Sequence, residues 1–492
     1  MSGVPLSAAT LDQLPVEVAV PRYDRSALTT GVVHLGVGGF HRAHQAVYLD
    51  ALMNQGQALD WALCGVGVLP SDARMRDALT AQDGLYTLVV KDPDGSWSAQ
   101  VIGSVHEYLL APDDPEAVVE KMASPGVRVV SLTVTEGGYN VSPMTGEFVA
   151  DTPGVVHDLQ PGAAPATSFG LVVEALVRRR ERGLAPFTVV SCDNIAGNGD
   201  VARRSFAAFA ALRSPELGEW VRTQVPFPNS MVDRITPATT DSDRAEVSRR
   251  FGIEDAWPVV CEPFTQWVLQ ESFAAGRPPL EQVGVQVVDD VEPYELMKLR
   301  LLNASHQALC YLGHLAGYEL VHEVAQDPLF AAFLLSYMDV EATPTLLAVP
   351  GIDLDDYKHT LITRFSNAGV RDTVARLCAE SSDRIPTWLL PVVRENLAHD
   401  GQVHRAALVV AAWARYAEGV DEQGGPITVV DRLAERLQAA AGRQREDPLA
   451  FLRDRELFGD LVDEPRFTGP YLAALDSLHR VGARATLAAQ PL

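Results

Sequence analysis

The sequence predicts an α/β domain at the N-terminus followed by a mainly α-helical domain at the C-terminus. A chain of 492 residues is too long for one ordinary core. Strand-like and helix-like segments alternate in its first half, whereas helical periodicity dominates from about Pro293 onward. We therefore place the two domains at residues 1–288 and 289–492.

Short apolar runs mark the strands of the first domain. They predict strands at residues 31–35, 61–66, 86–90, 100–105, 128–135 and 187–192, with helical patterns at residues 41–54 and 169–182. Asp94 and Gly95 predict a hairpin turn between the third and fourth of these strands. Strands that alternate with helices predict a parallel sheet with helices on both faces.

The second domain begins with a long predicted helix. Pro293 suits the first turn of this helix, and Gly317 suits its end. Apolar residues cover most of its circumference, so we expect the helix to be buried. The most apolar run of the chain, residues 406–414, is too short to span a bilayer and is typical of another buried helix.

The composition argues against several classes of function. The formal net charge of -24 disfavours general binding to nucleic-acid phosphates, because such binding requires a basic surface. The N-terminal segment lacks the basic and apolar stretches of a secretory signal. The five cysteines form no CxxC pair, which favours reduced thiols over disulfides or a zinc site. We therefore expect a cytoplasmic protein that binds neither nucleic acid, nor membrane, nor metal.

A glycine-rich turn follows the first predicted strand. Gly36, Gly38 and Gly39 would let the backbone approach a pyrophosphate, and the next helix would offer free N–H groups. Phe40 belongs to the same candidate cofactor site. The usual pattern is GxGxxG, but His41 occupies its third glycine position, so an ordinary strand–helix turn is an equal alternative from spacing alone. The position of the turn at the first strand favours a nucleotide.

Asp72 lies near the end of the second predicted strand, where a carboxylate would bind the ribose hydroxyls of NAD. Such a carboxylate repels the 2′-phosphate of NADP, so we expect NAD as the cofactor. The alternative is that Asp72 only caps the following helix. Arg74 and Arg76 are near in sequence and could weaken the preference for NAD.

Lys298, Asn303 and His306 are polar residues inside the apolar helix that begins at about Pro293. At about 100° per residue, the three side chains project within an arc of about 140° and could face one pocket. A buried lysine is a usable base near neutral pH because burial disfavours its charged form. An amide can donate to a developing alkoxide, and a histidine can orient a hydroxyl.

Each of these residues also has a simpler explanation. Lys298 could extend to solvent, while Asn303 and His306 could be polar core residues with internal partners. The three together in so apolar a helix favour a catalytic role. Tyr294 and Lys298 also form the YxxxK spacing of short-chain dehydrogenases, but their position at the start of a helical domain disfavours that reading.

Five segments of the chain occur in the order GVGGFHRAH, SLTVTEGGY, SCDNIAGNG, FPNSMVDRITP and KLRLLNASH. In this order they closely resemble the polyol-specific long-chain dehydrogenases, and the likeness extends over nearly the whole chain. The resemblance implies a Rossmann-type N-terminal domain, a mainly helical C-terminal domain and an active site between them. It also implies metal-independent chemistry with NAD, commonly in a monomer.

The resemblance also implies roles for individual residues. It makes Lys298 the base, Asn194 and Asn303 the oxyanion-hole donors, and His306 the group that orients the substrate. Asn194 follows the strand ending in FTVVSC, where ligands of α/β sheets bind, although a turn residue is the simpler interpretation.

Four further residues complete the expected substrate site. Asp233 and Arg376 match residues that contact substrate hydroxyls, and Glu136 matches a glutamate that serves proton passage to solvent. Without the resemblance, Asp233 would be read as a helix or turn cap. Arg384 is the basic residue of SSDRIPTW, in which Thr387 stands where relatives often carry lysine. Asp72 follows a serine where relatives often have a second acidic residue, so the preference for NAD could be less strict.

The expected reaction is the interconversion of D-mannitol and D-fructose with NAD. Reduction of fructuronate or tagaturonate and oxidation of arabinitol are alternatives within the family, because these enzymes share the same catalytic helix. A zinc-dependent alcohol dehydrogenase would need clustered Cys and His ligands, and the chain lacks convincing spacing for them. A non-catalytic NAD-binding sensor would keep the glycine turn but would not need Lys298 with two asparagines.

Overall fold

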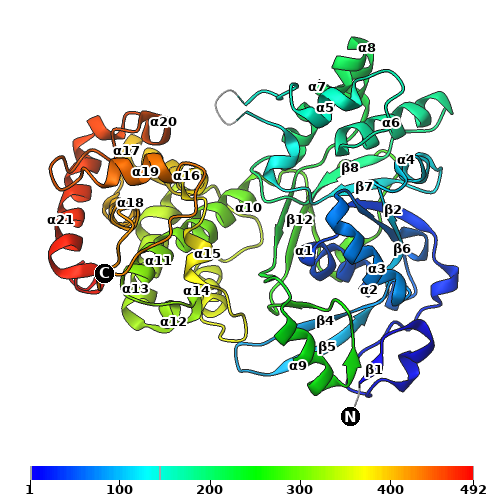
Figure 1. Cartoon of the computed structure of the whole chain (residues 1–492), viewed down its shortest axis with the longest axis horizontal. Coiled ribbons are helices and arrows are strands. Elements are labelled where there is room, and N and C mark those ends of the chain that lie inside the picture. The colour runs from blue at the N-terminus through cyan, green and yellow to red at the C-terminus, as the bar shows by residue number, and fades with distance from the viewer. Residues whose placement is uncertain (1–2, 143–145, 491–492) are drawn as a thin grey trace. The chain divides into compact units, whose positions relative to one another are not determined.

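The computed structural model describes residues 3–142 and 146–490. The chain forms two compact units, of which the first ends at Val291 and the second begins at Glu292. The first unit contains all the strands assigned within the described residues, and the second is built from helices and loops (Figure 1). This is a Rossmann-like α/β domain followed by a mostly helical one, which confirms the predicted fold class.

The central sheet of the first unit has five parallel strands in the order β6-β3-β2-β7-β8. Their bounds are β2 Thr30–Leu35, β3 Ala62–Gly67, β6 Val105–Leu110, β7 Val129–Leu132 and β8 Thr188–Ser191. The strand order reverses direction at β2, because β3 lies on one side of it and β7 on the other. Ligands of such sheets bind at this reversal, beyond the carboxyl ends of the strands.

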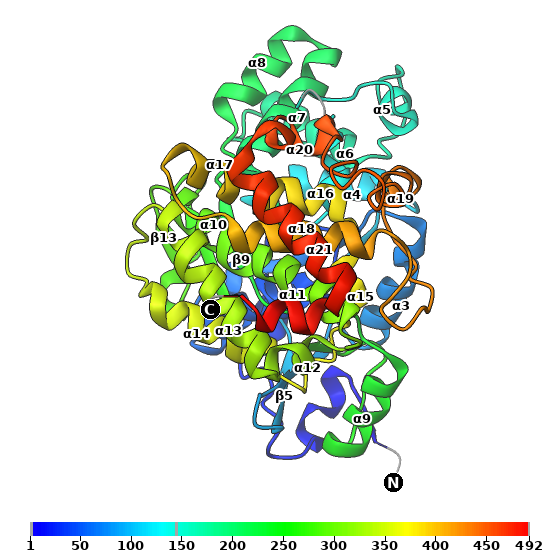
Figure 2. The ribbon, with the colours of Figure 1, turned by 90° about the vertical axis from the view of Figure 1, so that its left-hand side faces the viewer.

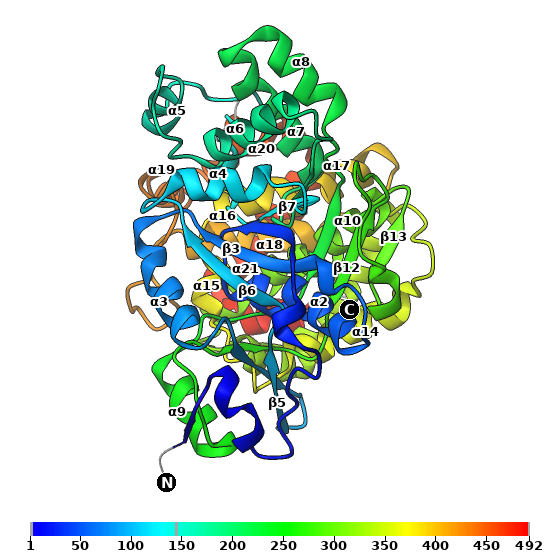
Figure 3. The same ribbon diagram turned by 90° about the vertical axis from the view of Figure 1, so that its right-hand side faces the viewer.

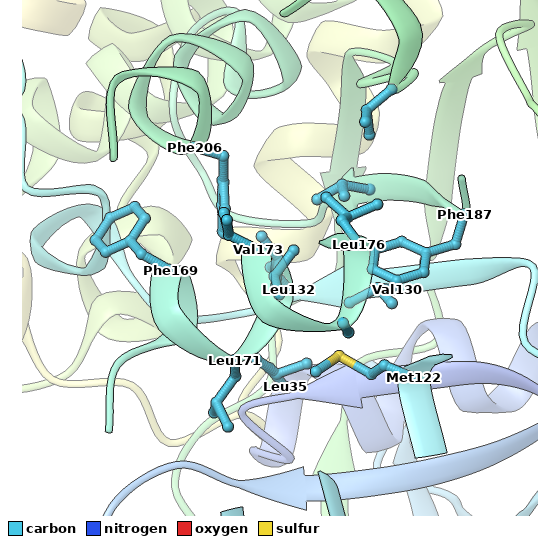
Figure 4. Close-up of a cluster of buried hydrophobic side chains, with 14 of the residues drawn as sticks. Leu35, Met122, Val130, Leu132, Phe169, Leu171, Val173, Leu176, Phe187 and Phe206 are labelled. Atoms are coloured by element: carbon cyan, nitrogen blue, oxygen red, sulfur yellow. The ribbon is translucent and has the colours of Figure 1, made fainter. Parts of the chain in front are cut away.

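Both faces of the sheet are covered, which explains why its strands read as continuous apolar runs. One face packs against α4 (Pro115–Ala123), α6 (Ser168–Glu181) and α7 (Asn198–Arg213) through one large apolar cluster. Figure 4 shows Leu35, Val130 and Leu132 from the strands with side chains of these helices. The other face meets α2 (Gln45–Asn54) and strand β12 (Gln266–Gln270) in a second cluster.

The first unit also contains two three-stranded sheets and a parallel pair formed by β1 (Val4–Pro5) and β10 (Ile253–Glu254). In one, β4 (Tyr86–Lys91) pairs antiparallel with β5 (Trp97–Ile102) and parallel with β11 (Val259–Cys261). In the other, β12 lies between β9 (Ser230–Asp233) and β13 (Gln286–Val288). Figure 3 shows β3 and β6 of the central sheet with α3 (Ala73–Ala81) and α4 nearby. The predicted hairpin between β4 and β5 is confirmed, and its turn contains Gly95 at φ +86°.

Two sequence predictions in this unit are wrong in detail. The predicted strand at 100–105 joined the end of β5 to the start of β6, although Gly103 and Ser104 separate the two. The predicted helix at 41–54 is broken at His44, so that α1 (Gly39–Ala43) and α2 are distinct. Side chains cause this break: the Tyr86 hydroxyl and the Arg234 guanidinium donate to the carbonyls of Arg42 and Ala43.

The second unit is organised around α11 (Ala304–Leu315), which packs against α15 and α18. Its other main elements are α10 (Glu292–Met297), the π-helical turn η7 (Lys298–Asn303), α12 (Val321–Gln326), α13 (Pro328–Tyr337), the π-helical turn η8 (Met338–Ala342), α14 (Leu354–Phe365), α15 (Val374–Cys378), α16 (Ser381–Arg384), the π-helical turn η10 (Ile385–Leu389), α17 (Leu390–Ala398), α18 (His404–Tyr416), α19 (Ala434–Ala441), α20 (Arg455–Phe458) and α21 (Pro465–Ala488). Figure 2 shows α21 crossing over α18. Gly317, at φ +89°, follows α11 and ends it as predicted.

Helix α18 is buried along its length, which confirms the interpretation of residues 406–414. Across the described part of the chain, every helix is too short or too polar to cross a bilayer. The N-terminus of α18 needs partners for its free N–H groups, and its N-cap residue, Val403, has no side-chain oxygen to supply them. Glu341, a completely buried residue of η8, accepts from the backbone N–H groups of Arg405 at 2.7 Å and Ala406 at 2.9 Å.

Burial raises the pKa of Glu341 to about 7, against the opposing effect of the two amides and of Arg405. Between about pH 4.5 and this value, the folded protein holds a proton that the unfolded chain has released. The free energy of unfolding therefore falls as the pH rises through this window, by up to about 3 kcal/mol from this group.

We expect Glu341→Gln to remove this step, because the amide keeps the size of the side chain but carries no charge. Thermal unfolding of variant and wild type from about pH 5 to about pH 8 measures the effect. Relative to the wild type, the variant should gain stability as the pH rises, whereas a Glu435→Gln control at an exposed position of α19 should not. A difference that does not change with pH would contradict the assignment.

Candidate functional site

The glycine turn lies at the carboxyl end of β2, as predicted. Gly36 has φ +90°, and a Cβ atom there would stand 2.2 Å from the Thr133 carbonyl oxygen. Gly38 has φ -97° and caps α1, and a Cβ atom there would meet no atom closer than 4.0 Å. Gly36 is therefore required by the fold itself, whereas Gly38 leaves open space beside the turn. Gly39 and Phe40 begin α1.

His41 replaces the third glycine of the usual pattern without disturbing the turn. Its ring is buried and stacks on the ring of His34 in β2, with the centroids 3.4 Å apart. His34 also bonds Ser131 and Thr133 through its two ring nitrogens. Burial lowers the pKa of His34 to about 3 and that of His41 well below its usual value, so both rings are neutral at physiological pH.

Asp72 lies just beyond the end of β3. Its Oδ2 accepts from the backbone N–H groups of Val68 and Leu69, both at 2.9 Å. The carboxylate therefore closes the short turn that leaves the strand. Asp72 is the N-cap residue of α3 by position, but its side chain makes no capping hydrogen bond to that helix. Arg76 pairs with Asp77 and Asp113, and Arg74 lies over the ring of Trp257.

Asn194 and Glu136 lie in the loops that follow the adjacent strands β8 and β7, and both are exposed. Because the strands are parallel, the two loops leave the sheet at the same edge as the glycine turn. Asp233 occupies the last position of β9, where it is buried opposite Gln266 of β12. Asp233 is therefore not a helix cap, because it belongs to a strand.

Sequence reasoning missed two buried side chains that organise these loops. Asp193 accepts from the backbone N–H groups of Val134 and Thr135, so it joins the loop after β8 to the loop after β7. Asn198 donates to the Ser191 and Ser230 carbonyls and accepts from the Ser230 N–H, so it joins β8 to β9. The signal was present in SCDNIAGNG, a run of polar residues directly after a buried strand.

In the second unit, Lys298 and Asn303 are the first and last residues of the π-helical turn η7. Both are buried, at 7% and 4% exposure. The expected continuous α-helix is therefore wrong at this point. A π-turn bonds residues five apart, as the Ala304 N–H does to the Leu299 carbonyl, so it brings residues 298 and 303 onto one side more closely than α-helical geometry would. Such turns occur frequently at functional sites.

The amide nitrogen of Asn303 is buried and has no hydrogen-bond partner within the described residues. A buried donor without an acceptor costs about 1–3 kcal/mol, so its retention calls for an explanation. An oxygen atom of a bound ligand would satisfy it. His306 follows in the first turn of α11, is half-buried, and packs its ring 4.6 Å from that of Phe365.

The two predicted arginines, Arg376 and Arg384, lie on the short helices α15 and α16, and both donate hydrogen bonds within the protein. Arg376 donates to both carboxylate oxygens of Asp372. Arg384 donates to the backbone carbonyls of Arg376 and Leu377, and its guanidinium lies 5.6 Å from the ring centroid of Trp388. A charge-paired Arg376 is suited to contact neutral hydroxyls more than to bind an additional carboxylate.

Comparison with known proteins assigns the family. Residues 30–282 match the mannitol dehydrogenase Rossmann domain, and residues 290–479 match the mannitol dehydrogenase C-terminal domain. The chain belongs to the mannitol dehydrogenase family. The mannitol 2-dehydrogenase of Phaeosphaeria nodorum is 48% identical over 98% of this chain and 85% of its own length. That of Aspergillus fumigatus is 47% identical over 99% of both chains.

Solved structures of similar proteins agree with this family. Mannitol 2-dehydrogenase of Pseudomonas fluorescens, in a ternary complex with NAD and D-mannitol, is 47% identical, covers 99% of both chains and has a TM-score of 0.90. A D-sorbitol dehydrogenase in substrate-free form is 37% identical, with a TM-score of 0.89 over 98% of this chain and 100% of its own. Both structures extend over the two units of the present chain.

The two glycines of the turn should respond differently to alanine. Gly36→Ala should lower the melting temperature, because its Cβ would collide with the Thr133 carbonyl oxygen and φ +90° is strained for alanine. Gly38→Ala should leave the melting temperature unchanged, because the added methyl group meets open space. Thermal unfolding of both variants measures this, and equal losses of stability would contradict the described turn.

Proposed function

We propose that this protein catalyses the NAD-dependent interconversion of D-mannitol and D-fructose. The observation that carries the proposal is the pair in η7: a buried lysine, five residues before a buried amide whose N–H group lacks an acceptor. These are the two groups that alcohol oxidation needs, a base and a donor to the alkoxide. The ternary complex of the 47% identical relative supports the choice of cofactor and sugar.

In this proposal, residues 1–288 bind NAD and residues 289–492 bind the polyol. The turn of Gly36, Gly38, Gly39 and Phe40 would hold the pyrophosphate, because the open space beside Gly38 permits close approach of a ligand. Asp72 would bind the ribose hydroxyls, since its turn fixes the carboxylate just beyond the end of β3. NAD, when bound, accepts the hydride.

Lys298 takes the proton of the reacting hydroxyl while the hydride leaves the carbon that bears this hydroxyl. Asn303 and Asn194 donate hydrogen bonds to the oxygen as its negative charge develops. These bonds lower the activation barrier because they are stronger in the transition state than in the bound substrate. His306 orients the reacting hydroxyl. The reverse reaction returns the proton from Lys298 to the keto oxygen.

The remaining predicted residues have supporting roles. We assign Asp233 and Arg376 to the other hydroxyls of the sugar, with Arg384 beside Arg376, and Glu136 to the passage of the proton to solvent. The pairing of Arg376 with Asp372, and the bonding of Arg384 to backbone carbonyls, favour a neutral polyol over a uronate. We also propose that the enzyme acts in the cytoplasm as a monomer; all five of its cysteines are free and buried.

Replacement of Lys298 tests the proposed base. Lys298→Ala should lower kcat by about a thousandfold or more, because no other group would take the hydroxyl proton, while NADH binding measured by fluorescence should persist. The matched control is Lys358→Ala, which removes a buried lysine of α14 that pairs with Asp339 and Asp355 and has no assigned role. Wild-type turnover in Lys298→Ala would refute the proposed mechanism.

The choice of sugar is tested by steady-state assays of the wild type with NAD or NADH. D-mannitol and D-fructose should give the highest kcat/KM, ahead of D-sorbitol, arabinitol and fructuronate. A higher kcat/KM for fructuronate than for fructose would instead assign the chain to the uronate reductases.

Replacement of Asp72 tests the preference for NAD. Asp72→Ala should raise the KM for NAD by about tenfold and reduce the preference for NAD over NADP, because it removes both the ribose acceptor and the charge that repels a 2′-phosphate. The control is Asp12→Ala, which removes an exposed carboxylate of the first unit. An unchanged ratio of kcat/KM values for the two cofactors would overturn the role given to Asp72.

A further inference from the structure

The backbone directly before Glu136 is held in a strained conformation. Thr135 has φ +65° and ψ 168°, a region that β-branched residues almost never adopt. Such a conformation costs about 1–3 kcal/mol and persists only where neighbouring groups enforce it. Strain of this kind is concentrated at functional sites, and here it sets the direction in which the next residue leaves β7.

The carboxylate of Asp193 enforces this conformation. Its Oδ1 accepts from the Thr135 N–H at 2.8 Å, and its Oδ2 accepts from the Val134 N–H at 3.2 Å and from the Tyr139 hydroxyl at 2.6 Å. Asp193 is 7% exposed, so water does not compete strongly for these bonds. A single carboxylate therefore holds both ends of the short turn Glu136–Tyr139.

Further contacts make this turn tight. The hydroxyl of buried Tyr139 lies 2.6 Å from the Ser191 Oγ at the end of β8. A Cβ atom on Gly138 would stand 2.8 Å from the Val134 Cγ2. The turn therefore packs directly against Val134, the residue before the strained Thr135. Burial raises the pKa of Asp193 and the Glu136 charge adds to this, whereas the three donors oppose it.

Asp193 is also the residue immediately before Asn194. Its side chain fixes the start of the Glu136 turn, and its main chain leads into Asn194, so one residue links two of the proposed functional groups across adjacent strands. We propose that Asp193 is a positioning residue for the reaction: it sets the position of Glu136 relative to Asn194. In this position Glu136 can pass the proton of the reaction to solvent. This inference rests on the proposed function.

A double-mutant cycle tests this role. Asp193→Asn offers one acceptor oxygen in place of two, so it cannot hold both the Thr135 amide and the Tyr139 hydroxyl in the same way. Asp193→Asn and Glu136→Gln should each lower kcat by about ten- to a hundredfold, with similar changes in the pH profile of kcat. The double variant should be no slower than the slower single variant, because both changes interrupt the same proton path.

Asp50→Asn is the matched structural control. Asp50 is another buried carboxylate of the first unit that accepts from a tyrosine hydroxyl, a backbone N–H and a side-chain amide, those of Tyr23, Gly103 and Asn54. The Asp50→Asn variant should have a lower melting temperature but should keep the wild-type pH profile of kcat. Tyr139→Phe is a milder variant that removes one donor, and its smaller loss of kcat should also vanish in the Glu136→Gln background.

Two results would overturn the positioning role. One is a loss of kcat in the double variant that equals the product of the losses in Asp193→Asn and Glu136→Gln. The other is a loss of kcat in Asp50→Asn equal to that in Asp193→Asn, with the same change of pH profile. The proposed function is tested separately: wild-type turnover in Lys298→Ala refutes its mechanism, whereas a strongly impaired Lys298→Ala with independent Asp193 and Glu136 effects refutes only the role of Asp193.

Discussion

Hydrogen bonds from polar side chains to backbone groups at the carboxyl edge of the parallel sheet determine the arrangement of the first unit. Parallel strands end together at this edge, where each departing loop must find new partners for its buried N–H and carbonyl groups. Thr133 donates to the Gly36 carbonyl, Asp193 accepts from the loop after β7, and Asn198 joins β8 to β9. The glycine turn, Glu136, Asn194 and Asp233 all lie on segments that these bonds fix.

In the second unit, side chains likewise bond backbone groups of the π-turns. The Tyr337 hydroxyl donates to the Arg300 carbonyl within η7, and the Asn396 amide donates to the Glu341 carbonyl within η8. Glu341 in turn supplies the cap that α18 lacks. Local departures from α-helical geometry thus have side-chain partners in the buried core, while Asn303 keeps a donor that the described protein groups do not use. The unused donor of Asn303 lies in the same π-turn as Lys298, which makes it a candidate partner for a ligand oxygen.

Sequence periodicity predicted the parallel sheet, the hairpin at Gly95 and the end of α11 at Gly317, because strand alternation and glycine turns are local signals. It failed where distant side chains compete for the backbone. The predicted helix 41–54 breaks because Tyr86 and Arg234 take its carbonyls, and the helix after Pro293 contains a π-turn. The family resemblance, which the comparisons confirm, supplied the candidate residues that no spacing rule could identify.

By itself, the sequence determined the fold class, the glycine turn and the polar residues of the apolar helix, since each depends on the order of residue types along a short segment. Only the tertiary structure decided the geometry at those places. The strain at Thr135 exists because Asp193, 58 residues later, accepts its N–H. Asp72 closes a turn where helix capping was an equal reading, and Asp233 lies in a strand, because hydrogen bonds and strand pairing of the folded chain select one of several locally acceptable conformations.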